Sequence, residues 1–72
     1  MARLPGVTAR EVLRVARMLG YQIREGSRHT IIHDGRQVIT TVPRTGGALK
    51  RGLVAGIVSD LGLTADDFRK LL

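Results

Sequence analysis

The fold is decided by residues 21–43, which read YQIREGSRHTIIHDGRQVITTVP. Three runs in this stretch alternate apolar with polar residues or are rich in β-branched residues, and short glycine-containing segments separate them. Such runs predict strands at residues 21–25, 28–33 and 36–42. Because connections this short join strands that run in opposite directions, we expect one three-stranded antiparallel sheet.

Two turns and a proline set the ends of these strands. Gly26-Ser27 turns the chain between the first two strands, and Asp34-Gly35 lies between the second and the third. The Asp-Gly pair predicts a two-residue type I′ hairpin, because both central positions of that turn have positive φ and both residues tolerate it. Pro43 has no N–H to donate to the sheet and therefore ends the third strand.

A helix is expected before the sheet. Thr8 and Glu11 have the spacing of a capping box, and Val7 and Val12 flank this box as a hydrophobic staple. Gly20 supplies the left-handed residue that ends the helix. The apolar stripe between these ends is formed by Val12, Leu13, Val15, Ala16 and Leu19, and the opposite face carries Arg10, Arg14 and Arg17.

Two more helices are expected after the sheet. The longer one follows the Thr45-Gly46-Gly47 loop, has apolar residues at helical spacing and ends at Gly62. Gly52 and Gly56 each weaken this helix by about 1 kcal/mol relative to alanine, and we expect close packing on the sheet to compensate. Thr64 caps a last short helix, whose acidic first turn lies at the positive end of the helix dipole.

The sequence therefore predicts a single α+β domain over residues 1–72. Its order is α-β-β-β-α with an extra short C-terminal helix. The amphipathic helices pack on one face of the sheet and leave the other face open. A domain of 72 residues has no room for a deep cavity, so we expect a functional site on a surface patch or in a shallow groove.

The charge is uneven and positive. The chain carries a formal net charge of +6. Residues 1–51 hold ten Lys and Arg against three Asp and Glu, whereas residues 52–72 hold two against three. A basic face on a small domain indicates a polyanionic partner, and an acidic protein would fit the same field. Arginine outnumbers lysine by ten to two, and its planar guanidinium suits phosphate.

Other classes of protein are excluded or disfavoured. The chain has no cysteine, which removes disulfide frameworks and thiolate metal sites. No apolar run approaches the roughly 20 residues of a membrane span. Residues 1–6 lack the apolar core of a signal peptide, and we expect a cytoplasmic protein.

Both histidines lie in the second predicted strand. His29 and His33 are four residues apart, which on a strand puts them on one face but about 13 Å apart. They cannot then share one metal ion or act together on one phosphate. His33 precedes the Asp34-Gly35 turn and is expected to bond its backbone. His29 is the better candidate for proton transfer near neutral pH, and an ordinary surface histidine is the alternative.

The remaining motifs are weaker. Ser27 has no partner that would make it a hydrolase nucleophile. Residues 46–51, GGALKR, open the second predicted helix and could bind an anion through free N–H groups, although the P-loop pattern is missing. Tyr21 and Phe68 are the only aromatic residues, and both fit core positions. Recognition of a nucleic acid would therefore depend on phosphates and shape rather than on base stacking.

Short motifs in a fixed order run along nearly the whole chain. They are Leu4-Pro5-x-Val7-Thr8, Gly20-Tyr21, Gly26-Ser27, Val42-Pro43, Leu49-Lys50-Arg51-Gly52 and Leu61-Gly62-Leu63-Thr64. In this order and spacing the chain resembles the HicA toxin family. Members of that family are small mRNA interferases with a fold related to the double-stranded RNA-binding domain.

The resemblance has three departures near the histidines. The family's catalytic histidine most often follows a Gly-Ser pair directly, whereas here Arg28 takes that place and His29 comes one residue later, as in a minority form. The family's His-Pro-Asp-Gly turn is shortened to His33-Asp34-Gly35, and Arg44 replaces a frequent histidine after Val-Pro. A shift of one residue turns a strand side chain to the other face unless a bulge corrects it, and Gly26 would allow such a bulge.

The resemblance implies the toxin of a type II toxin–antitoxin system, a ribosome-independent and metal-independent mRNA endoribonuclease without a cofactor. His29 would be the general acid or base. The phosphate-binding residues would be Arg28, Arg44, Lys50 and Arg51. A HicB-type antitoxin would inhibit the enzyme, and no membrane is involved. The alternative is a catalytically degenerate module of the same fold that binds RNA or a partner protein. A DNA-binding regulator is disfavoured, because the chain lacks a basic recognition helix.

Overall fold

The computed structural model describes residues 6–72. The predictions made on Met1 to Pro5, which concern a signal peptide and the Leu4-Pro5 motif, lie outside these residues. The elements in chain order are α1 (Ala9–Met18), β1 (Gln22–Glu25), β2 (His29–His33), β3 (Val38–Pro43), α2 (Arg51–Asp60) and α3 (Ala65–Leu71). This order confirms the predicted α-β-β-β-α arrangement and the extra C-terminal helix.

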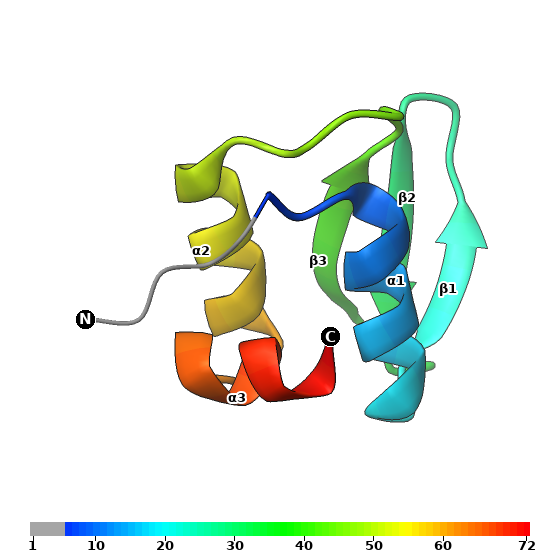
Figure 1. Cartoon of the computed structure of the whole chain (residues 1–72). Helices are drawn as coiled ribbons and strands as arrows, with labels where there is room; N and C mark the ends of the chain where they lie inside the picture. The colour runs from blue at the N-terminus through cyan, green and yellow to red at the C-terminus, as the bar shows by residue number, and fades with distance from the viewer. Residues whose placement is uncertain (1–5) are drawn as a thin grey trace.

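The sheet has the order β1-β2-β3, and both pairs of strands are antiparallel. Figure 1 shows the three helices on the same side of this sheet. The other face of the sheet has no covering element among residues 6–72, as the sequence predicts. The β1–β2 turn and the segment after β3 lie at one end of the molecule, and the β2–β3 turn lies at the other.

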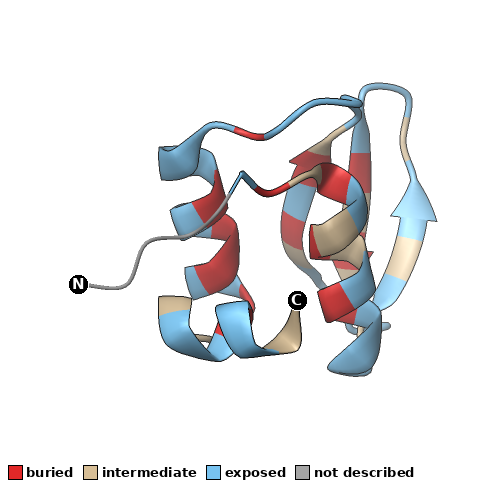
Figure 2. Cartoon of the chain, viewed as in Figure 1, coloured by how far each residue is buried: buried red, intermediate tan, exposed pale blue. Residues whose placement is uncertain are grey.

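The core lies between the helices and the sheet. Figure 2 shows buried positions on the inner sides of α1 and α2 and on alternating positions of the strands. The largest fully buried side chain is Phe68 of α3, which has no exposed surface. Ile32 and Val42 of the sheet belong to the same buried cluster. Among the helices of residues 6–72, none has the length and apolar character of a membrane span.

Local signals in the sequence set both ends of α1. The side-chain oxygen of Thr8 accepts from the Glu11 N–H at 3.3 Å, and the Glu11 carboxylate accepts from the Thr8 N–H at 3.0 Å. At the other end Gly20 has a φ of 91°. Tyr21 N–H donates to the Ala16 carbonyl and Gly20 N–H to the Arg17 carbonyl, which is a Schellman motif. The predicted capping box and glycine stop are both confirmed.

The packing predicted for Gly52 and Gly56 is wrong. Both glycines are exposed, and a Cβ added at either would meet nothing within 4 Å. The helix packs through Val54, Ile57 and Val58 instead. The two glycines fall on the opposite face of the 3.6-residue period, so close packing on the sheet does not compensate for their helix penalty.

The hairpin predicted at Asp34-Gly35 is longer than two residues. Gly35 has a φ of 93°, but no non-glycine residue in the described part of the chain has positive φ, which rules out a type I′ turn. The Asp34 carboxylate accepts from the N–H groups of Arg36 and Gln37 at 2.8 and 2.9 Å. These bonds hold residues 34–37 in a turn, so β3 begins at Val38 rather than at residue 36.

Candidate functional site

The open face of the sheet carries both histidines. His29, Ile31 and His33 alternate with Thr30 and Ile32, which are buried toward the helices. The two histidines therefore share the open face, as their spacing predicts. Each of them lines a separate hollow, one toward each end of β2.

The first hollow surrounds His29. Its lining is formed by Gly26, Ser27, Arg28, His29, Ile31 and Thr41. The imidazole is exposed, and its strand position pairs with Pro43 of β3. The volume of about 420 Å³ is within the range of sites for small molecules, which is enough room for one nucleotide unit. The histidine and the cation next to it in the sequence thus lie in one solvent-accessible depression.

Gly26 sets the backbone position of His29. Its N–H donates to the His29 carbonyl at 2.9 Å, which closes the turn between β1 and β2. A Cβ built on Gly26 would lie 2.5 Å from that carbonyl oxygen. No side chain fits in that space, so the reason for glycine is a close approach of two backbone segments rather than a left-handed φ.

We expect Gly26→Ala to move the His29 backbone. The clash is with a main-chain oxygen, so it can be relieved only by a backbone shift, which costs about 1–3 kcal/mol. The measurements are the free energy of unfolding in urea and the rate of the His29-dependent reaction proposed below. Gly46→Ala is the matched control, because a Cβ at Gly46 meets nothing within 4 Å. Equal stability and activity of the two variants would contradict this role of Gly26.

Arg44, which follows β3 in the chain, stabilises the same turn. Its guanidinium donates to the Gly26 carbonyl at 3.0 Å and lies 3.4 Å from the Glu25 carboxylate. Its backbone N–H donates to the Arg28 carbonyl at 3.2 Å. The side chain remains about half exposed. Arg44 therefore lies beside the His29 hollow and has free N–H donors, but part of its hydrogen-bonding capacity goes to the turn itself.

The other predicted phosphate ligands are not at the His29 hollow. Lys50 and Arg51 are the N-cap and the first residue of α2, in the helix layer, and neither lines the hollow. Figure 1 shows the segment between β3 and α2 crossing the end of the molecule, so these cations lie beyond that crossing. Arg28 and His29 are adjacent in the sequence and line the same hollow. The fold places Lys50 and Arg51 away from that hollow.

The second helix begins later than predicted, at Arg51 rather than directly after the Thr45-Gly46-Gly47 loop. Leu49 N–H donates to the Val7 carbonyl at 2.7 Å, and Ala48 bridges to Thr8. This pairing holds the segment in an extended conformation, so α2 cannot begin before residue 51. The glycine N–H groups are therefore not at the helix N-terminus and do not form the anion cradle that the sequence suggests.

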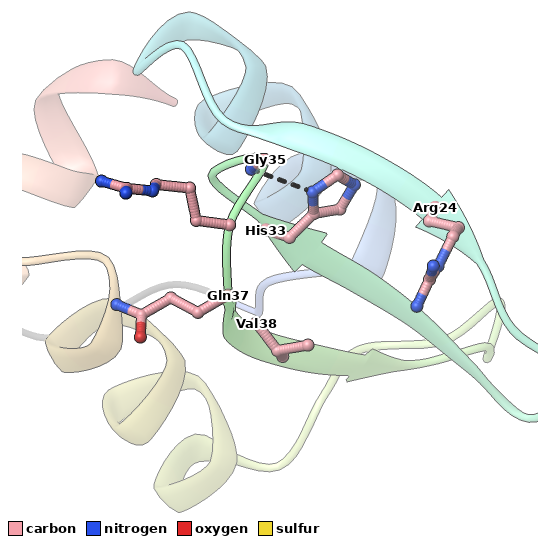
Figure 3. A pocket seen from close by; sticks show the side chains of 6 residues that line it. Arg24, His33, Gly35, Gln37 and Val38 are labelled. Carbon is pink, nitrogen blue, oxygen red and sulfur yellow. Dashed lines mark hydrogen bonds between the residues drawn. The ribbon is translucent and has the colours of Figure 1, made fainter.

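The second hollow surrounds His33 at the other end of the same face. Its lining is formed by Arg24, His33, Gly35, Arg36, Gln37 and Val38, and Figure 3 shows how the labelled residues lie. His33 Nδ1 accepts from the Gly35 N–H at 3.1 Å, the type of bond that we expected from its position before the turn. The N–H groups of Gln37 and Arg36 lower the pKa of the neighbouring Asp34 carboxyl below its ordinary value.

Arg24 and Arg36 both line the His33 hollow, and neither is among the phosphate ligands expected from the sequence. Arg24 pairs with Ile31, the residue midway between the two histidines. The sequence contains a signal for the outward position of Arg24, because its neighbour Ile23 faces the core and adjacent strand residues face opposite sides.

A further hollow lies on the exposed side of α1 and is lined by Arg10, Glu11, Arg14 and Arg17. In residues 6–72 no three His, Asp or Glu side chains gather to hold a metal ion.

Fold and site together define a small α+β domain with an open sheet face on which arginines flank one exposed histidine, His29, and one half-buried histidine, His33. The model of the HicA toxin of bacterial toxin–antitoxin systems matches residues 9–63, and the chain therefore belongs to the HicA toxin family. Membership makes it the toxin component of such a system and implies an antitoxin partner. No curated protein and no solved structure matches the chain.

Proposed function

We propose that the protein is an endoribonuclease that cleaves single-stranded regions of mRNA in the cytoplasm, with His29 as its proton-transfer group. The observation that carries the proposal is the exposed imidazole of His29 in a hollow shared with Arg28, on the uncovered face of the sheet. Membership of the HicA toxin family supports the same activity. The hollow is large enough for one nucleotide unit, and extended RNA can reach it from the open face.

The reaction is a transfer within the RNA backbone. The ribose 2′-oxygen attacks the adjacent phosphorus, the bond from phosphorus to the 5′-oxygen breaks, and the products are a 2′,3′-cyclic phosphate and a 5′-hydroxyl. His29 takes the proton from the 2′-hydroxyl or gives one to the leaving 5′-oxygen, and solvent water makes the other of these two proton transfers. This chemistry needs no metal ion, because the imidazole moves the proton and cations stabilise the charge on the phosphoryl oxygens.

The cations have separate tasks in this proposal. Arg28 lines the hollow and binds the phosphate that reacts. Arg44 holds the turn through Gly26 and directs its remaining donors to the same phosphate. Lys50 and Arg51 at the start of α2 bind phosphates further along the RNA strand. His33, Asp34 and Gly35 build the β2–β3 turn.

The same face supports inhibition by a protein. A HicB-type antitoxin that covers the His29 hollow would exclude RNA, and an acidic surface would match the arginines of this face.

A direct test is cleavage of a single-stranded RNA by the purified protein in the presence of a chelator. We expect cleavage to continue with EDTA and to yield 2′,3′-cyclic phosphate ends. A substrate with a 2′-deoxy residue at the cleaved position should not react, because the nucleophile is missing. Loss of activity with EDTA, or cleavage of the 2′-deoxy substrate, would contradict the mechanism.

One observation favours a second function. His29 is the only histidine or carboxylate among the residues that line its hollow, so a second proton-transfer group is not in place there. A module that binds RNA or a partner protein without cleaving RNA needs only the arginines. RNA affinity that falls steeply with salt, together with no cleavage, would identify this function.

A further inference from the structure

The His33 hollow and the His29 hollow lie on one continuous surface. His29, Ile31 and His33 follow one another on the open side of β2, and Arg24 lies opposite Ile31 on β1. Ile31 lines the first hollow and Arg24 lines the second. The two histidines are separated by about 13 Å, four strand residues, a distance that an extended nucleic acid strand covers within a few nucleotides.

The His33 imidazole presents a donor to this second hollow. Its Nδ1 accepts a hydrogen bond from the Gly35 N–H, so in the neutral ring the proton is on Nε2. In Figure 3 that second nitrogen points away from Gly35. The turn therefore fixes both the orientation and the tautomer of the His33 side chain.

The charges around His33 favour an anion. Arg24 and Arg36 both line the hollow, and no carboxylate does. The neighbouring Asp34 uses its Oδ1 to accept from two backbone N–H groups in the turn. Val38 adds an apolar surface at the edge of the hollow and is 54% exposed.

We propose that Arg24, Arg36 and the Nε2–H of His33 form a second phosphate-binding subsite, which holds the RNA backbone along the open sheet face while the His29 hollow takes the reacting phosphate. The inference rests on the proposed function for the identity of its ligand. The subsite aligns the RNA along β2. It therefore determines in which direction a single-stranded RNA lies on the sheet, and how long that RNA must be, for a phosphate to reach His29.

Binding is measured separately from cleavage to test this inference. The His29→Ala protein is titrated with a fluorescent single-stranded oligoribonucleotide, and affinity is followed by anisotropy at several salt concentrations. We expect Arg24→Gln in this background to weaken binding about three- to tenfold and to reduce the salt slope by about 0.7, the value for one phosphate contact on a single strand. The control is Arg14→Gln, which removes the same charge from the exposed side of α1.

Two substitutions of His33 separate a phosphate contact from a turn contact. His33→Asn keeps an acceptor near the Nδ1 position and loses the outward donor, whereas His33→Gln keeps a donor near Nε2 and loses the turn acceptor. The subsite predicts that His33→Asn weakens RNA binding with an unchanged thermal midpoint. It also predicts that His33→Gln lowers the midpoint and retains more of the binding. A purely structural histidine predicts the same midpoints but the reverse order of binding: His33→Asn would bind RNA like the parent and His33→Gln would bind it more weakly. That order would overturn the inference.

The phosphate itself is found by replacing single phosphates with neutral methylphosphonates. One methylphosphonate, at a position away from the scissile phosphate, should weaken RNA binding by the protein that retains Arg24. The same methylphosphonate should have no further effect on binding by the Arg24→Gln protein. Equal losses for Arg24→Gln and Arg14→Gln, or an effect of Arg24→Gln on antitoxin binding alone, would overturn the subsite and leave the proposed function intact. If no variant or parent protein binds or cleaves RNA, the proposed function fails with it.

Discussion

Replacing His29 by alanine is expected to lower the rate of RNA cleavage by about 10²- to 10⁴-fold, the usual contribution of one general acid or base. The fold should not change. The imidazole is exposed, and the bond that closes the turn uses the His29 backbone carbonyl, which alanine retains. Surface substitutions of this kind alter stability by less than about 0.5 kcal/mol. The measurements are single-turnover cleavage rates and urea unfolding of both proteins.

The same substitution has an expected result in cells. Production of the unsubstituted toxin without its antitoxin should arrest growth, and production of the His29→Ala protein should not. Arg17→Gln is a suitable control, since Arg17 is exposed on α1, outside the residues that line the His29 hollow. Equal growth arrest by the His29→Ala protein and the parent would remove His29 from the mechanism.

Replacing Phe68 by alanine is expected to have the largest effect on stability. Phe68 is fully buried, and large-to-small changes of a buried phenylalanine cost about 3–5 kcal/mol. A chain of 72 residues has a total stability of about 4–11 kcal/mol, so the variant loses a large part of it. We expect the thermal midpoint to fall by at least about 12 °C.

This result would also show that α3 is part of the domain. The family match ends at residue 63, whereas Phe68 of α3 belongs to the same buried core cluster as residues of α1, α2 and the sheet. Lys70→Ala is the matched control, because Lys70 is exposed on the same helix. If both variants unfold at the same temperature as the parent, Phe68 does not contribute to the core in the way that its burial indicates.

Much of the site follows from the alternation of residues along one strand. Thr30 and Ile32 are buried, so His29, Ile31 and His33 must face the other side, and the sequence predicts this. Arg28 takes the place of the family's usual histidine, so the face on which His29 lies depends on where β2 begins. The tight turn at Gly26 makes β2 begin at His29, and the His29 side chain lies on the open face.

Other features depended on contacts that the sequence does not display. Gly26 is needed because the His29 carbonyl approaches it, which only the folded turn creates. Between Ile32 and His33 the pairing with β3 shifts, so His33 lies opposite Val38 and Ile39 is the extra residue. This bulge lies next to the turn at residues 34–37 and depends on how that turn connects β2 to β3, not on the strand propensity of the residues.

Local rules account for the features that the sequence predicts correctly: the capped ends of α1, the three strands, the antiparallel sheet and the shared face of the two histidines. These depend on hydrogen bonds and periodicities within a few residues. Apart from Arg28, which is adjacent to His29 in the sequence, the cations near each histidine are set by tertiary contacts. Lys50 and Arg51 lie away from His29 because residues 48 and 49 pair with residues 7 and 8, while Arg24 joins the His33 hollow through pairing across strands. Long-range contacts of this kind are absent from any local pattern, since they form only when the chain closes its loops.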